Sequence, residues 1–286
     1  MRIHLIAYRL RRSKGLTLIE LLVAMAVSGI LIAGVYRTFI GQHKTYAAQE
    51  QIVDMRQNAR VAISRMMREI RMAGFGNVSD VLSLSGGVNS FTQVITPGSN
   101  GFGNAITIVG GFRQIKDPTT GDPITVTSAA GNTITLSKAT DEFDGNAHKY
   151  ISVGGIGSYI VQSRSGSNLT LDRTPIHPVG ANIFKISAIT YDLYLSDGKI
   201  VLGRNENTGG YSQPVAEHIE TLGFRYTLDD GSESDFPVNP SRIRMVKVTV
   251  TARTSVSDPE FKGGTEGYRR RTITSNILVR NMGANP

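Results

Sequence analysis

Residues 15–36 read GLTLIELLVAMAVSGILIAGVY, and Glu20 is the one strongly polar residue between Leu16 and Val35. About 20 apolar residues are enough for a helix that crosses the hydrocarbon core of a membrane. A charged side chain at membrane depth costs about 2.5–3.5 kcal/mol on insertion scales, so it is kept mainly where it has a function. The stretch therefore predicts a membrane-spanning helix over residues 16–36, with Glu20 as a candidate functional residue.

The flanks of this apolar stretch predict its orientation. Five basic residues precede it, namely Arg2, Arg9, Arg11, Arg12 and Lys14, and no acidic residue does. Short basic flanks stay on the cytoplasmic side of a membrane. We therefore expect a single-pass inner-membrane protein whose long C-terminal part faces the periplasm.

Two simpler interpretations of the N-terminus remain open. In an ordinary secretory signal, Ala24-Met25-Ala26 would be the small-residue cleavage site. Such a signal would have an apolar core of only Leu16 to Val23, interrupted by Glu20. A plain uncleaved anchor is the second possibility, but it accounts for neither Gly15 nor Glu20.

Helical periodicity continues beyond the apolar stretch. No proline occurs between Leu16 and Ile95, and apolar residues recur three and four positions apart. They are Ile52, Met55, Ala59, Ala62, Ile63, Met66 and Ile70. Gly74 and Gly76 form a stop signal. We expect one helix over residues 16–73, with residues 37–75 as its amphipathic half.

The rest of the chain has the pattern of β-structure. Short β-branched runs separated by turn residues predict a β-rich region over residues 76–188 and a C-terminal antiparallel sheet over residues 189–286. A hairpin pattern near residue 131 recurs 35 residues later, which indicates a duplicated unit over residues 123–153 and 158–188. The predicted fold class is α+β, with a long N-terminal helix packed on an antiparallel sheet and an inserted barrel or sandwich of hairpins.

The residues around Glu20 resemble the processing signal of type IV pilins and pseudopilins. In that family a short basic leader ends in glycine, and an apolar residue and Thr-Leu-Ile-Glu follow; here Leu16 stands where phenylalanine is usual. The resemblance implies a leader over residues 1–15, cleavage by prepilin peptidase between Gly15 and Leu16, and methylation of the Leu16 amine. It also implies that Glu20 pairs with the N-terminal amine of a neighbouring subunit. A protonated Glu20 without a partner is the alternative.

Later segments resemble the PilW family of minor pilins. They are Gln57-Asn58-Ala59-Arg60, Arg68 to Phe75, Gln213 to Glu217, and Arg269 to Asn281. The resemblance implies a non-enzymatic subunit that primes pilus assembly with other minor pilins and the major pilin. A tip adhesin is a further expected partner, and twitching motility and cell adhesion are expected processes. The protein would pass from the inner membrane into the extracellular pilus.

Two other functions remain open at this point. A minor pseudopilin of type II secretion, similar to the J subunit, would share the leader and a comparable head. A membrane-tethered periplasmic enzyme is the alternative from a different class. The sequence shows no catalytic constellation and no cofactor motif, so we expect no cofactor.

Charge and acidic clusters add little to this prediction. The net charge of +8 includes the five basic residues of the leader, so the remaining chain carries +3, and we predict no nucleic-acid partner. The run Arg269-Arg270-Arg271 is expected to be a charged strand edge. Asp229, Asp230, Glu233 and Asp235 form a weak calcium candidate that does not follow EF-hand spacing, so an exposed acidic turn is the preferred interpretation.

Overall fold

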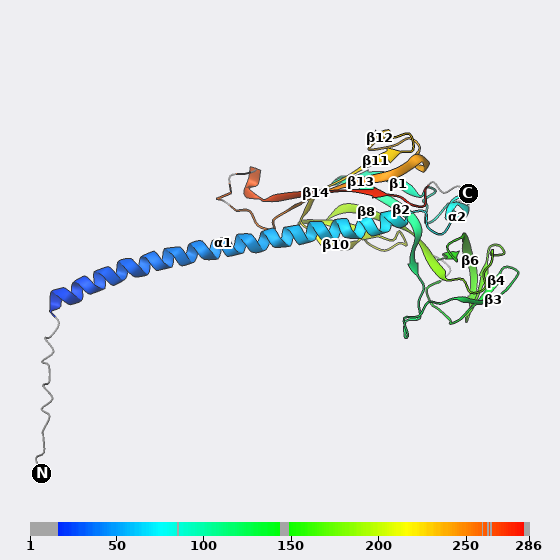
Figure 1. Cartoon of the computed structure of the whole chain (residues 1–286), viewed down its shortest axis with the longest axis horizontal. Helices are drawn as coiled ribbons and strands as arrows, with labels where there is room; N and C mark the ends of the chain where they lie inside the picture. The colour runs from blue at the N-terminus through cyan, green and yellow to red at the C-terminus, as the bar shows by residue number, and fades with distance from the viewer. Residues whose placement is uncertain are drawn as a thin grey trace, which may run out of the picture. The chain divides into compact units, whose positions relative to one another are not determined.

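A computed structural model describes residues 17–84, 86–143, 149–258, 260, 261, 263 and 265–282. Its first element is the helix α1 (Leu18–Met72), shown in blue and cyan in Figure 1. The helix ends just before Gly74 and Gly76, whose φ angles of 80° and 96° favour glycine. The predicted long helix is therefore confirmed over the described residues; Leu16 lies outside them. The chain divides into two compact units after Glu50, and each is described separately.

The second unit begins at Gln51 and contains the amphipathic half of α1. The residues that α1 buries are Met55, Ala59, Ala62, Ile63, Met66, Glu69 and Ile70. Residues three and four apart lie on one face of a helix, so these side chains form a single stripe. All the apolar members of this stripe were predicted, whereas the buried carboxylate of Glu69 was not.

Two antiparallel sheets share a core with this stripe. Five strands of the larger sheet are β1 (Ile95–Asn100), β2 (Gly103–Gln114), β8 (Ile183–Ser196), β9 (Lys199–Asn205) and β10 (Gln213–Glu217). The smaller sheet has the order β12-β11-β13-β14, built from β11 (Ile219–Leu228), β12 (Glu233–Ser234), β13 (Ile243–Arg253) and β14 (Arg270–Leu278). Apolar residues of both sheets join Met66 and Ile70 in one buried cluster. The α+β class expected from the sequence is confirmed.

Local signals explain several of these strands. Val246, Val248 and Val250 on β13 are fully buried, whereas Lys247 between them is exposed, as the alternating pattern requires. β8 and β9 form a hairpin whose turn residues Asp197 and Gly198 both have positive φ. Asp-Gly is a favoured sequence for such a two-residue turn.

Three short helical segments complete the described fold: α2 (Ser79–Leu82), η1 (Pro240–Arg242) and η2 (Thr265–Gly267).

An inserted barrel occupies the middle of the chain. Its strands are β3 (Val126–Ala130), β4 (Thr133–Leu136), β5 (Tyr150–Val153), β6 (Gly157–Ser165) and β7 (Asn168–Leu171), in the order β8-β5-β6-β7-β4-β3. Figure 1 labels β3, β4 and β6 in this part of the chain. A bridge between Thr125 and Asn182, next to the start of β8, closes the ring. The N–H of Val126 donates a 3.0 Å hydrogen bond to the carbonyl of Ala181 at the same place. The barrel encloses its own apolar cluster.

The two hairpins of the barrel are related by a local two-fold axis. In each hairpin the register is the same, and a bulge follows the first paired residue, Val126 in one and Val161 in the other. The strands β4 and β7 pair around Ile134 and Leu169, which stand at equivalent positions of the two hairpins. The N–H of Leu136 donates to the carbonyl of Ser167, and the equivalent N–H of Leu171 donates to the carbonyl of Asn132. The 35-residue repeat thus corresponds to two hairpins with one conformation.

The strand β8 belongs to both the barrel and the larger sheet. Ile183 to Lys185 pair with β5 in the barrel, whereas Thr190 to Ser196 pair with β9. The expected boundary between residues 188 and 189 therefore falls inside a single continuous strand. β1 and β2, expected in the preceding β-rich region, pair with each other, and β2 pairs with β8 in the larger sheet.

Candidate assembly site at the start of the helix

The start of α1 is capped by Thr17 and Glu20. Glu20 Oε2 accepts hydrogen bonds from the backbone N–H of Thr17 at 2.9 Å and from its hydroxyl at 3.0 Å. In return, the N–H of Glu20 donates to Thr17 Oγ1 at 3.3 Å. This reciprocal arrangement is a capping box, which satisfies N–H groups that have no partner within the helix. Glu20 therefore caps its own helix, and its expected pairing with the amine of a neighbouring subunit stays a prediction.

The capping box opens a long apolar surface within the first unit. Large side chains from Leu18 to Val35 have exposed fractions of 50% to 78%. By length and composition, α1 is the one helix of the described residues that could cross a membrane, and none of its most apolar window is buried. Exposed apolar surface of this extent needs a lipid or protein environment. The surface and the carboxylate of Glu20 together make up the candidate site.

The predicted processing residues Gly15 and Leu16 lie outside the described residues. Thr17, the first described residue, follows the expected cleavage point by one position. Cleavage and methylation there therefore remain predictions.

Within the second unit, a buried polar cluster connects α1 to the larger sheet. The Tyr191 hydroxyl on β8 donates a 2.7 Å hydrogen bond to Glu69 Oε2, and Arg204 Nε on β9 lies 3.1 Å from Glu69 Oε1. Arg65 adds a third contact at 3.2 Å, one turn earlier on the helix. Burial, and next the charge of Glu69, raise the pKa of the Tyr191 hydroxyl, so it stays protonated and can donate. The cluster thus connects the buried face of α1 to β8 and β9.

The acidic residues proposed for calcium are paired with arginines. Arg242 contacts Asp229 at 2.7 Å and Asp230 at 2.9 Å, and Arg225 contacts Glu233 at 2.8 Å. Among the residues that the structure describes, no group of three or more potential ligands has a geometry that could hold a metal ion. Asp235 is exposed in the segment after β12. The arrangement is that of a charged turn, and we do not propose a calcium site.

The arginine run lies at the beginning of β14. Arg269 contacts Asp258 at 3.0 Å, and Arg270 holds both oxygens of Glu220 at 2.6 and 2.7 Å. Arg270 and Arg271 are the first two residues of the edge strand β14, so the expected charged strand edge is present. Arg271 is exposed.

Comparisons with known proteins agree with the N-terminal signal. Residues 10–36 match the family model described as prokaryotic N-terminal methylation motif. No curated protein matches this chain significantly. Among solved structures, a type IV-like pilin from Thermus thermophilus is similar at 10% identity, covering 79% of this chain and 97% of that one, with a TM-score of 0.38. That score is too low to support an argument about shared detail.

Two features of the site were not predicted from the sequence. The capping box has a clear sequence signal, Thr-x-x-Glu before an apolar run, which is present at Thr17 to Glu20. The Glu69 cluster has no local signal, because Tyr191 and Arg204 follow 122 and 135 residues later.

Proposed function

We propose that this protein is a minor pilin of the PilW type, which is cut after Gly15 and enters a type IV pilus through its apolar helix. The methylation-motif match over residues 10–36 carries the proposal, since it covers the site at which prepilins are processed and the whole apolar stretch. The exposed side chains of α1 supply the surface that would pack first in lipid and then among other helices. The C-terminal sheets and barrel would present the surfaces that select partners.

Glu20 would have two successive roles in this proposal. In the isolated chain its carboxylate caps α1 through Thr17. During assembly the same carboxylate would pair with the methylated amine of a neighbouring subunit, which would offset the cost of a charge at membrane depth. The partners would be other minor pilins and the major pilin, with prepilin peptidase acting beforehand and a tip adhesin joining afterwards. No step requires a cofactor or chemistry by this chain.

The variant Glu20→Gln distinguishes the capping of α1 from the pairing with a neighbouring subunit. Glutamine can replace glutamate in a capping box but carries no charge. We expect normal cleavage and about tenfold less protein in sheared pili, since the loss of one interaction worth about 1.4 kcal/mol changes an equilibrium tenfold. Thr17→Ala is the control, because it removes the cap at a cost of about 1 kcal/mol and leaves the carboxylate. Normal incorporation of Glu20→Gln would contradict the pairing role.

Deletion of the gene tests the wider proposal. Cells without the protein should lose most surface pili, and the native chain should restore them. Intact pili together with a defect in protein secretion would instead assign the chain to a secretion pseudopilus.

A further inference from the structure

Sheet edges offer unpaired backbone groups, and proteins protect them with prolines, bulges, short strands or covering segments. Four edges of the described strands are protected. β1 contains Pro97, β10 contains Pro214 and a bulge, and β12 has only two residues. The barrel edge at β3 is closed by the bridge between Thr125 and Asn182.

The strand β14 is different. It is nine residues long, contains no proline, and pairs with β13 in an unbroken register from Arg253–Arg270 to Met245–Leu278. No strand of the described residues pairs with its outer edge. Its only charged residues are Arg270 and Arg271 at its first two positions. Beyond these two edge charges, seven uncharged residues form an edge that, among the described residues, has no proline, no bulge and no added strand.

The register shows which backbone groups of β14 face outward. The N–H of Val279 donates to the carbonyl of Arg244, and the N–H of Thr254 donates to the carbonyl of Arg269. Hydrogen-bonded pairs alternate along an antiparallel ladder, so odd-numbered residues of β14 bond to β13. The N–H and C=O groups of Thr272, Thr274, Asn276 and Leu278 therefore point away from β13. Their side chains are also exposed.

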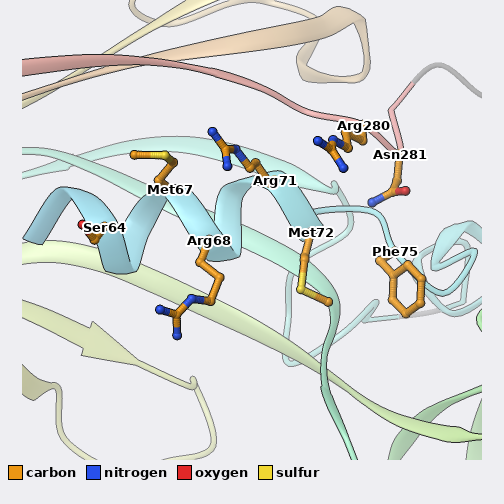
Figure 2. Close-up of a pocket in the computed structure, with 8 residues that line it drawn as sticks. All are labelled: Ser64, Met67, Arg68, Arg71, Met72, Phe75, Arg280 and Asn281. Carbon is orange, nitrogen blue, oxygen red and sulfur yellow. The ribbon is translucent and has the colours of Figure 1, made fainter. Parts of the chain in front are cut away.

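A basic groove begins where β14 ends. It has a volume of about 550 Å³ and is lined by Ser64, Met67, Arg68, Arg71, Met72, Phe75, Arg280 and Asn281. Figure 2 shows Arg71 and Arg280 near each other, with Arg68 pointing to the other side of the helix. No salt bridge joins Arg71, Arg280 or Arg271 to a carboxylate of the described residues. Cations without a salt bridge to any described carboxylate thus flank the outer edge of β14 at both ends.

We propose that β14 accepts an extended segment of another pilus subunit as an added strand. Main-chain hydrogen bonds to Thr272, Thr274 and Asn276 would hold the segment, as in other cases of strand addition. Acidic side chains at its two ends would pair with Arg271 and with Arg71 and Arg280. Met67 and Phe75 in the groove would contact an apolar side chain of the segment. The partner's identity as a pilus subunit rests on the proposed function.

The chain has no cysteine, so single cysteines can report on this edge. In the full-length protein in pilus-forming cells, Asn276→Cys would carry a benzophenone crosslinker. Lys247→Cys is the matched control, because Lys247 lies directly opposite Asn276 on the interior strand β13 and is also exposed. We expect Asn276→Cys to crosslink one acidic-ended segment of another chain with the methylation motif, several-fold more than Lys247→Cys does. Equal crosslinking from both positions would overturn strand addition.

Variants of the backbone and of the charges test strand addition and charge pairing separately. Thr274→Pro removes an outward N–H but no bond to β13, so it should abolish the crosslink while the melting temperature changes little. Thr274→Ala keeps the N–H and should keep the crosslink. Arg71→Glu combined with Arg280→Glu should reduce the crosslinking yield about tenfold, although no residue of β14 is changed. A crosslink that survives both Thr274→Pro and the double charge reversal would overturn the proposal.

The remaining outcomes separate this inference from the proposed function. Normal pilus incorporation without any Asn276 crosslink would reject strand addition and leave the pilin assignment intact. An Asn276 crosslink to a chain without the methylation motif would reject a pilus subunit as the partner. If the leader also stays uncleaved in those cells, so that Leu16 never becomes the N-terminal residue, the pilin assignment would be rejected as well. Displacement of the crosslink by a DNA duplex, dependent on Arg71 and Arg280, would assign the groove to phosphate and overturn the acidic segment.

Discussion

The hydroxyl of Tyr191 on β8 donates a 2.7 Å hydrogen bond to the carboxylate of Glu69 on α1. Both side chains are almost completely buried, and Arg204 is the nearest opposite charge from the sheet. A buried carboxylate is tolerated only where hydrogen bonds and a cation compensate for lost hydration. The contact therefore joins α1, the one helix of the described residues long enough to span a membrane, to the larger sheet of the second unit.

Tyr191→Phe should destabilise this unit by about 1.5–3 kcal/mol, the range for a hydrogen bond to a charged group. Denaturant unfolding of the full chain in detergent measures the effect. Tyr226→Phe is a matched control, because the Tyr226 hydroxyl is buried without a hydrogen-bond partner among the described residues, so its loss should be nearly neutral. A Tyr191→Phe variant as stable as Tyr226→Phe would show that the hydrogen bond contributes nothing.

The local two-fold axis of the barrel predicts that substitutions at equivalent positions lower the stability of the barrel by similar amounts. Ile134 and Leu169 face each other across the axis and are fully buried. Each substitution to alanine should cost about 2–5 kcal/mol. Ala130→Ser at the exposed end of β3 should stay within about 0.5 kcal/mol of the native chain. Chemical unfolding followed by circular dichroism measures all three, and a large cost at only one of the two buried positions would argue against equivalent roles.

The charged turn after β11 predicts a loss of stability in acid. Hydrogen bonds from Ser232, and next from Arg242, lower the pKa of Asp230 to about 2. Because this value lies below that of an unfolded aspartate, near 3.9, the stabilisation is present above about pH 4 and is lost as the pH falls toward 2. Asp230→Asn should therefore melt at a lower temperature than the native chain at pH 6, and the difference should shrink by pH 2.5. A constant difference across this range would contradict the assignment.

Local patterns in the sequence predicted much of the fold. The apolar periodicity of Met55 to Ile70 depends on neighbours three and four positions away, and the helix buries that face. The hairpin signals at Gly131 and Gly166 also act over a few residues, and both glycines have φ near 60°. The double membership of β8 could not be predicted, because pairing with β5 and β9 depends on distant segments.

The candidate site was predicted in part. Glu20 was identified from its charge in an apolar run, yet its cap with Thr17 was missed although both residues are local. The pairing of Asp229 and Asp230 with Arg242 was missed for a different reason. The arginine follows them by 13 and 12 residues, respectively, and the direction of its side chain depends on the turn.

Mass spectrometry of the native protein's N-terminus tests the central claim most directly. Protein purified from its own cells should begin at Leu16, with one added methyl group on the amine. A chain that begins at Met1, or at Val27 after cleavage of an ordinary signal, would contradict the account.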